Sequence, residues 1–209
     1  MQEEYYKLPI IKTKEFIFSS LKNKTDNCSS CPLSTTPGLA VYGEGNIDAN
    51  IMFVGEAPGE TEAETGRPFV GRAGQLLDNM IASIGLSRED VYICNVVKHR
   101  PPNNRKPKPE EVEACLPFLH SQIQIVQPNI IVALGSTAIE ALLGPGPGVT
   151  KRCGKWEMLP TKEGIETIRV LPMFHPSALL RNPQWKEPAW YGMQKVKKMY
   201  EQQCLYWKK

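Results

Sequence analysis

The sequence has no uninterrupted apolar segment of the roughly 20 residues that a helix needs to cross a bilayer. Its first residues, Met1-Gln2-Glu3-Glu4, are acidic, whereas a secretory signal begins with a basic region followed by an apolar one. We therefore expect no membrane partner, no secretory signal and a soluble, cytoplasmic protein. No internal repeat is visible along the chain.

Two common phosphate-binding patterns are also missing. Neither the Gly-x-x-x-x-Gly-Lys-Ser/Thr spacing nor the Gly-x-Gly-x-x-Gly spacing occurs. Net charge is small, since 25 Lys and Arg residues face 22 Asp and Glu residues, giving +3. Such a mildly basic chain can contact nucleic acid without being required to do so. Its 209 residues suffice for one α/β core, so we expect a single domain over residues 1–209.

Cysteine is sparse, with six residues in the chain. In a reducing cytoplasm the Cys28-x-x-Cys31 pair indicates metal binding or redox chemistry rather than a disulfide. We favour metal binding, because Pro32-Leu33 and a polar turn follow the pair instead of a βαβ unit. Residues 1–40 therefore read as an amphipathic helix followed by an irregular metal-binding segment.

Buried strands and crossover helices alternate in the rest of the chain. Four apolar runs predict parallel strands, at Ile51–Val54, Val91–Val97, Ile130–Leu134 and Val170–Phe174. The spacers are long enough for helices, which we expect at Gly74–Ile84, Pro109–Val126 and Ser136–Leu143. This alternation predicts an α/β fold, with a parallel sheet that has helices on both faces.

The loops that follow these strands carry most of the unusual residues. They are Gly55–Gly59, the basic proline-rich stretch Lys98–Lys108, Gly135-Ser136 and the stretch Phe174–Pro183. Because the carboxyl ends of parallel strands share one edge of a sheet, we expect these loops to meet there, where α/β sheets form ligand pockets.

Several side chains in or near these loops suit a nucleobase, although each also has an ordinary structural reading. An amide such as Asn95 offers a donor and an acceptor to a base edge, or is simply capped or solvated. Phe69 can stack on a flat ring or belong to the core. An apolar side chain beside a cation, as in Leu179 near Arg181, suits a wedge between base pairs or a helix start.

Six blocks of sequence occur in a recognisable order: Gly55–Gly59, Gly66–Gly74, Asn95–Lys98, Arg100–Arg105, Cys115-x-Pro117 and His175–Arg181. Together they resemble the family-4 (iron–sulfur) uracil-DNA glycosylases, and the resemblance covers roughly residues 28 to 185. The resemblance implies a three-layer α/β/α sandwich around a four-stranded parallel sheet. It also implies an enzyme that flips uracil out of single- or double-stranded DNA and hydrolyses its N-glycosidic bond, leaving an abasic site.

The resemblance also implies a role for each matched residue. Phe69 would stack on uracil, Asn95 would bind its edge, and His175 would donate a hydrogen bond to uracil O2. Glu56, Ala57 and Gly59 would line the wall of the pocket. Leu179 would fill the gap that the flipped base leaves in the stack, and Ser177 and Arg181 would contact phosphates.

The group that handles the attacking water is open. Ala57 stands where better-known members of the wider superfamily carry an aspartate, so another group must act. Glu56 is the nearest candidate, with Glu62 or a backbone carbonyl as alternatives, and no strong base is required if charge stabilisation alone drives bond breaking.

One departure from the resembled family concerns its [4Fe–4S] cluster, which four cysteines hold. Cys28, Cys31 and Cys115 match, but His99 occupies the remaining cysteine position. Histidine ligates iron in some iron–sulfur centres, whereas a Cys₃His set also suits zinc. Cys94 could substitute only after a rearrangement, because five residues of extended strand span about 16 Å. We expect a cluster, with zinc as the alternative.

A second class of function stays open, that of a non-catalytic or covalently trapping uracil-DNA binding protein. A related group traps uracil-DNA through a histidine in an extended loop. The corresponding loop here, residues 101–109, contains no histidine. We therefore favour the enzyme, acting as a monomer.

Overall fold

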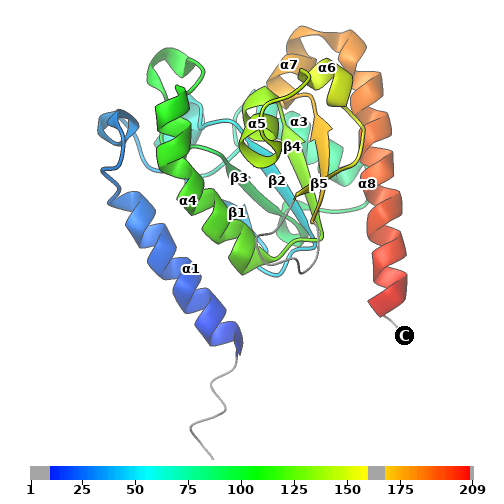
Figure 1. Ribbon diagram of the computed structural model, residues 1–209, viewed down its shortest axis with the longest axis horizontal. Helices are drawn as coiled ribbons and strands as arrows, with labels where there is room; N and C mark the ends of the chain where they lie inside the picture. Colours follow the sequence, from blue (N-terminus) through cyan, green and yellow to red (C-terminus); the bar gives the residue numbers. More distant parts are fainter. Residues whose placement is uncertain (1–9, 160–167, 208–209) are drawn as a thin grey trace, which may run out of the picture.

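The computed structural model describes residues 10–159 and 168–207 of the chain. Its centre is a six-stranded sheet with the order β1-β3-β2-β4-β6-β5 (Figure 1). The inner four strands are parallel: β2 (Ile51–Gly55), β3 (Tyr92–Asn95), β4 (Ile130–Leu134) and β6 (Ile168–Met173). The edge strands, β1 (Glu44–Gly45) and β5 (Glu157–Leu159), are short and antiparallel to their neighbours.

The four predicted parallel strands are thus confirmed, whereas the expectation of a four-stranded sheet missed the two edge strands. Those edges carry no apolar run that a pattern could detect, and only pairing with β3 and β6 makes them strands. The second predicted strand also ends early, at Asn95 rather than Val97. The backbone N–H groups of Val96 and Val97 still bond to the carbonyls of Gly55 and Glu56.

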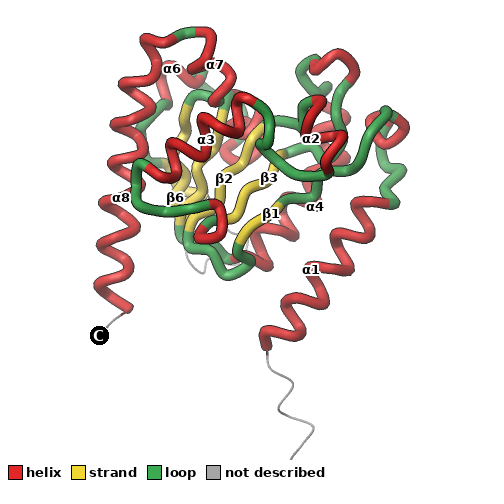
Figure 2. Tube along the Cα trace, turned by 180° about the vertical axis from the view of Figure 1, so that it is seen from behind, coloured by secondary structure: helices red, strands yellow, loops and turns green. Residues whose placement is uncertain are grey.

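Helices cover both faces of the sheet. The side chains of each strand alternate between the two faces, so each face contributes to its own core. Ile51 and Phe53 point to one core, Met52 and Val54 to the other. The first core is closed by α3 (Arg72–Ala82), α7 (Pro176–Arg181) and α8 (Lys186–Trp207); the second by α4 (Pro109–Val126) and α5 (Ser136–Leu143). Figures 1 and 2 show these layers from opposite sides, and the α/β/α sandwich is confirmed.

The N-terminal helix, α1 (Ile10–Asp26), lies along α4 outside the sandwich (Figure 1). Phe18 holds it there, because its ring packs edge-on against Tyr42 and Tyr92 with centroids 5.1 and 5.8 Å away. The cysteine-bearing segment follows, with one 3₁₀ turn at Pro32–Thr35. Residues 1–9 lie outside the described part of the chain.

Two of the three predicted helices have the predicted bounds. These are α4 and α5, whereas α3 begins and ends two residues earlier than the predicted Gly74–Ile84. The short helices α2 (Glu60–Thr65) and α6 (Val149–Arg152) were not predicted. No described helix is long and apolar enough to cross a membrane.

Because β2 lies between β3 and β4, the chain leaves β2 toward one side and later returns to its other side. Open α/β sheets bind ligands at such a reversal, outside the carboxyl ends of the strands. The ends of β2, β3, β4 and β6 carry the loops that the sequence singled out.

Candidate active site at the carboxyl edge of the sheet

Asn95, Phe69 and His175 meet at this edge. A Cβ atom placed on Gly55 would lie 2.4 Å from the Phe69 ring and 2.4 Å from Asn95 Oδ1, so only glycine allows this approach. The Phe69 and His175 ring centroids are 5.5 Å apart. The structure therefore joins the end of β3, the loop before α3 and the end of β6 in one site.

The side-chain carbonyl of Asn95 has no hydrogen-bond partner. Asn95 is 1% exposed, and its Oδ1 is one of two buried side-chain polar atoms in the described part of the chain that lack one. Leaving such an acceptor unpaired costs about 1–3 kcal/mol. An unpaired buried acceptor at a strand end that faces an aromatic ring suits a ligand that brings a donor.

His175 is held in one neutral tautomer. Its Nδ1 accepts the backbone N–H of Ser177 at 3.2 Å and lies 2.9 Å from the Ser177 hydroxyl oxygen. Burial, followed by the charge of Arg181, lowers the pKa of His175 to about 4, and Glu62 only partly opposes them. With Nδ1 accepting, the ring proton lies on Nε2, which makes Nε2 a donor.

Glu62 organises the loop around the site instead of remaining free for catalysis. One carboxylate oxygen accepts the N–H groups of Val70 and Gly71, each at 2.8 Å, and the other accepts that of Gly59 at 3.1 Å. This carboxylate joins the Gly55–Gly59 turn to the Phe69 loop. From the sequence, Glu62 is a candidate only for water activation, but its position three residues after the helix cap Gly59 is the signal for this structural role.

Glu56 follows β2 and accepts a hydrogen bond from the hydroxyl group of Thr137, a buried residue in α5. Thr137 was not recognised from the sequence. The contact joins the loops after β2 and β4, across the point where the strand order reverses. Ala57 is half-buried and packs against the core on the α4 side of the sheet.

The two consecutive leucines of α7 differ sharply in exposure. Leu179 is 1% exposed and belongs to the core, whereas Leu180 is 39% exposed. Leu179 therefore cannot enter a DNA stack without leaving the core. Arg181 is exposed and forms no ion pair within the described residues.

Most of the positive charge in the loop Lys98–Lys108 is neutralised within the protein. Arg100 pairs with Glu60, Arg105 with Glu111, and Lys106 with Glu140. Lys98 is fully buried, which leaves Lys108 as the exposed cation of this loop without an ion pair in the described structure. The composition of this loop therefore overstates its positive charge toward DNA.

The four predicted metal ligands lie in one region, beside the loop that follows β3. Cys28 and Cys31 are close enough to Cys115 to help raise its pKa, after burial as the main cause. The Lys98 backbone N–H bonds to Cys115 and lowers that pKa. His99, the next residue, is 6% exposed and lies near Asp26, just before Cys28.

These ligands are not arranged around a single ion. Within residues 10–159 and 168–207, no three His, Cys, Asp or Glu side chains are grouped so that they could hold one metal ion. A structural zinc needs four ligands at about 2.0–2.3 Å from one point. A multi-iron cluster is larger, so its ligands stand farther apart.

Lys98 supplies the charge that an anionic centre would need. Its ammonium group is fully buried and donates to two neutral oxygens, Asn95 O and Gln122 Oε1, each at 2.6 Å. Burial lowers the pKa of Lys98, and the nearby thiols of Cys94 and Cys115 oppose that shift. Cysteine binds metal as the thiolate, and a buried cation nearby favours that charged form. The donor set therefore suits an iron–sulfur cluster.

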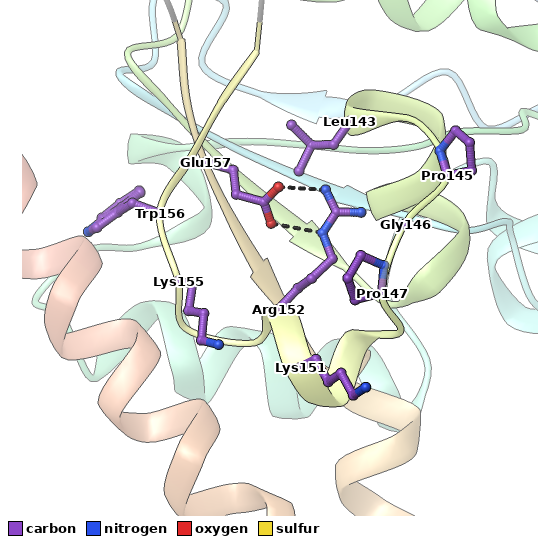
Figure 3. Close-up of a pocket in the computed structure, with 9 residues that line it drawn as sticks. All are labelled: Leu143, Pro145, Gly146, Pro147, Lys151, Arg152, Lys155, Trp156 and Glu157. Carbon is purple, nitrogen blue, oxygen red and sulfur yellow. Dashed lines mark hydrogen bonds and ion pairs between the residues drawn. The ribbon is translucent and has the colours of Figure 1, made fainter.

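A separate hollow of about 510 Å³ lies between the end of α5 and β5 (Figure 3). Lys151, Lys155 and Trp156 contribute to its walls, and Arg152 crosses it to form two hydrogen bonds with Glu157, at 2.8 and 2.6 Å. None of the predicted site residues lines this hollow.

The α/β fold agrees with comparisons to known proteins. Residues 42–194 match the profile of the uracil DNA glycosylase superfamily, and the chain belongs to that superfamily. A type-4 uracil-DNA glycosylase of Thermotoga maritima is 50% identical over 171 residues, covering 81% of this chain and 86% of the relative.

A second type-4 uracil-DNA glycosylase, from Archaeoglobus fulgidus, is 46% identical over 163 residues, covering 77% of this chain and 82% of the relative. A type-5 uracil-DNA glycosylase of Pyrobaculum aerophilum is 33% identical over 193 residues, covering 78% of this chain and 83% of the relative. Within the superfamily, the chain belongs to the type-4 uracil-DNA glycosylases.

Proposed function

We propose that this protein removes uracil from DNA by hydrolysing the N-glycosidic bond of a nucleotide flipped out of the helix. The observation that carries the proposal is the unpaired, buried Oδ1 of Asn95 beside the rings of Phe69 and His175. The type-4 relatives support it, since they carry that activity in their names.

Recognition follows from the hydrogen-bonding pattern of the base. Asn95 Oδ1 accepts the N3–H of uracil, and the amide nitrogen donates to uracil O4. Cytosine presents an acceptor and a donor at these two positions, so its binding would leave buried groups unpaired on both sides. Phe69 stacks on the base, and stacking on an aromatic ring contributes about 1–3 kcal/mol.

Catalysis depends on the charge that develops as the C1′–N1 bond breaks. The sugar becomes positive and uracil becomes an anion, so the Nε2–H of neutral His175 strengthens its bond to uracil O2 in the transition state. Water adds to C1′, its proton passes to solvent, and uracil leaves. Glu56 faces the positive sugar and orients that water, with Thr137 fixing its carboxylate.

DNA binding uses the α7 side of the edge. Arg181 contacts a phosphate, and the Ser177 hydroxyl turns its proton from His175 to that phosphate, while the Ser177 backbone N–H keeps donating to His175 Nδ1. Flipping the nucleotide costs a few kcal/mol of unstacking, less where uracil is mispaired. Uracil-containing DNA is therefore the partner, and a monomer suffices.

Cys28, Cys31, His99 and Cys115 would hold a [4Fe–4S] cluster whose role is structural. When bound, it fixes the N-terminal segment to the loop after β3, and hence supports the backbone next to Asn95. No step of the reaction passes through it.

Excision from a uracil-containing oligonucleotide, single- and double-stranded, tests the proposal. We expect free uracil and an alkali-labile site in the DNA strand. DNA that is bound but never becomes alkali-labile would indicate a binding protein without catalysis. An adduct that survives denaturation would indicate a covalent trap instead.

A further inference from the structure

Phe69 has a backbone conformation that a bulky side chain rarely adopts. Its φ angle is 52°, in the left-handed region that favours glycine. Such strain persists only where surrounding contacts impose it, and it concentrates at functional sites. The ring that we place against uracil is therefore held in position by other groups.

One of those groups is Glu62, which binds the amides after Phe69, as described above. The opposite side of the loop is bound by a cation. Arg88 donates to the carbonyl of Pro68 at 2.6 Å through Nη2 and to the carbonyl of Phe69 at 3.1 Å through Nη1. The peptide group after Phe69 is thus bound by Glu62 at its N–H and by Arg88 at its carbonyl, and the peptide group before Phe69 is bound by Arg88.

Arg88 is itself held firmly. Its Nε donates to Glu44 in β1 at 2.9 Å, and Nη1 also donates to Asp78 in α3 at 2.7 Å. The side chain is 19% exposed, so these contacts are partly shielded from water. Four acceptors around one planar guanidinium are a geometry that lysine cannot reproduce.

Packing leaves the loop little room to relax. A Cβ atom on Gly74, in the first turn of α3, would lie 1.8 Å from the Phe69 carbonyl oxygen. The helix therefore closes on the same carbonyl that Arg88 binds. Without Arg88, this carbonyl would lose its donor while remaining enclosed by α3.

We infer that Arg88 is a positioning residue for uracil recognition, which fixes the left-handed Phe69 peptide so that the ring presents its face to the base. The inference rests on the proposed function, because it assigns the base to Phe69. Arg88 contacts neither DNA nor uracil, and it acts through the Phe69 backbone alone.

The test uses DNA that the enzyme cannot cut. An oligonucleotide with one 2′-fluoro-2′-deoxyuridine keeps its glycosidic bond, and the same oligonucleotide with 2′-deoxycytidine, whose edge Asn95 cannot pair, measures binding outside the pocket. The ratio of the two dissociation constants reports the base pocket. We expect Arg88→Ala to reduce the preference for fluorouridine about tenfold, the size of a lost stacking contact, and Arg88→Lys to recover only part of it.

A matched control separates positioning from general stability. Arg152→Ala removes an arginine that is less exposed than Arg88 and that donates two hydrogen bonds to Glu157, away from the site (Figure 3). This variant should lower the melting temperature and leave the preference for 2′-fluoro-2′-deoxyuridine over the control nucleotide unchanged. An Arg88→Ala protein that loses stability yet keeps the wild-type preference would overturn the inference, and Arg88→Lys gives the same test if Arg88→Ala does not fold.

A double variant tests the route of the effect. If Arg88 acts through Phe69, adding Arg88→Ala to Phe69→Ala should cost no further preference. A further loss in that background would show that Arg88 acts on the base by another route and would also overturn the inference. A wild-type protein with no preference for fluorouridine, and no uracil release, would instead overturn the proposed function.

Discussion

The rings of Phe69 and His175 lie 5.5 Å apart and are tilted by 31°. At this separation the two rings are in contact, so a base must enter beside the pair and not between its members. In the proposed complex, uracil meets Phe69 with its face and the Nε2–H of His175 with its edge. The proposal therefore assigns base binding to Phe69 and transition-state stabilisation to His175.

Replacing Asn95 should separate stability from activity. Asn95→Ala removes a buried acceptor that has no partner, so we expect the free energy of unfolding to stay level or rise. Excision should fall by about two orders of magnitude or more, because uracil N3–H and O4 lose their partners. Single-turnover uracil release measures the excision rate, and urea denaturation of the same sample measures the free energy of unfolding. Near-normal release would remove Asn95 from the site.

The pH dependence of His175 has a definite sign. Its pKa is about 4 when folded, against about 6.5 in an unfolded chain. Between these values the unfolded chain binds a proton that the folded protein does not, so His175 lowers stability as the pH falls from about 6.5 to 4. Denaturation across this range should show a smaller loss in His175→Gln than in the wild type.

Excision by the wild type should show no titration of His175 between pH 8 and about 5. NMR titration of the imidazole checks this directly. A ring that is protonated at pH 6 would contradict the neutral donor and require charged catalysis.

The neighbouring leucines of α7 should respond in opposite ways. Leu179→Ala creates a core cavity and should cost about 2–5 kcal/mol of stability. Leu180→Ala should change stability by less than about 0.5 kcal/mol. If Leu180 fills the gap in the base stack, its loss should slow excision from duplex DNA more than from single strands. Equal effects on both substrates would exclude that role.

The metal centre can be tested at its unusual ligand. We expect an anaerobic preparation to contain iron and sulfide, and His99→Cys to retain both. Cys115→Ser should lose them and lower the melting temperature, whereas Cys153→Ala, at a thiol outside the predicted set, should not. A colourless protein with one zinc would show that the site binds a single ion after rearrangement. Loss of iron in Cys94→Ala would support Cys94 as the missing ligand.

The strand ends could be predicted because burial alone produces their pattern. Runs such as Ile130–Leu134 are apolar throughout, since a parallel strand between two helical layers has no exposed face. Asn95 and His175 interrupt or follow such runs, which marks them as polar groups placed at the edge. The edge strand Glu44–Gly45 carries no such signal.

The neutralisation of charge in the loop Lys98–Lys108 could not be predicted in this way, because some of the partners are distant in the sequence. Nothing local indicates that Arg100 pairs with Glu60 or that Lys98 is buried, and the loop reads as a positive surface. Arg88 likewise reads as a surface residue before a strand. Only the fold brings it to the carbonyls of Pro68 and Phe69.

The sequence by itself determined the order of strands and helices, the family and the residues that meet at the carboxyl edge. Hydrophobic periodicity and motif spacing are local properties, so one chain displays them without its fold. The tertiary structure decided which leucine is exposed, which carboxylate is engaged, and why Phe69 adopts a strained backbone. Each of these depends on contacts between distant segments, whose geometry exists only once the layers have packed.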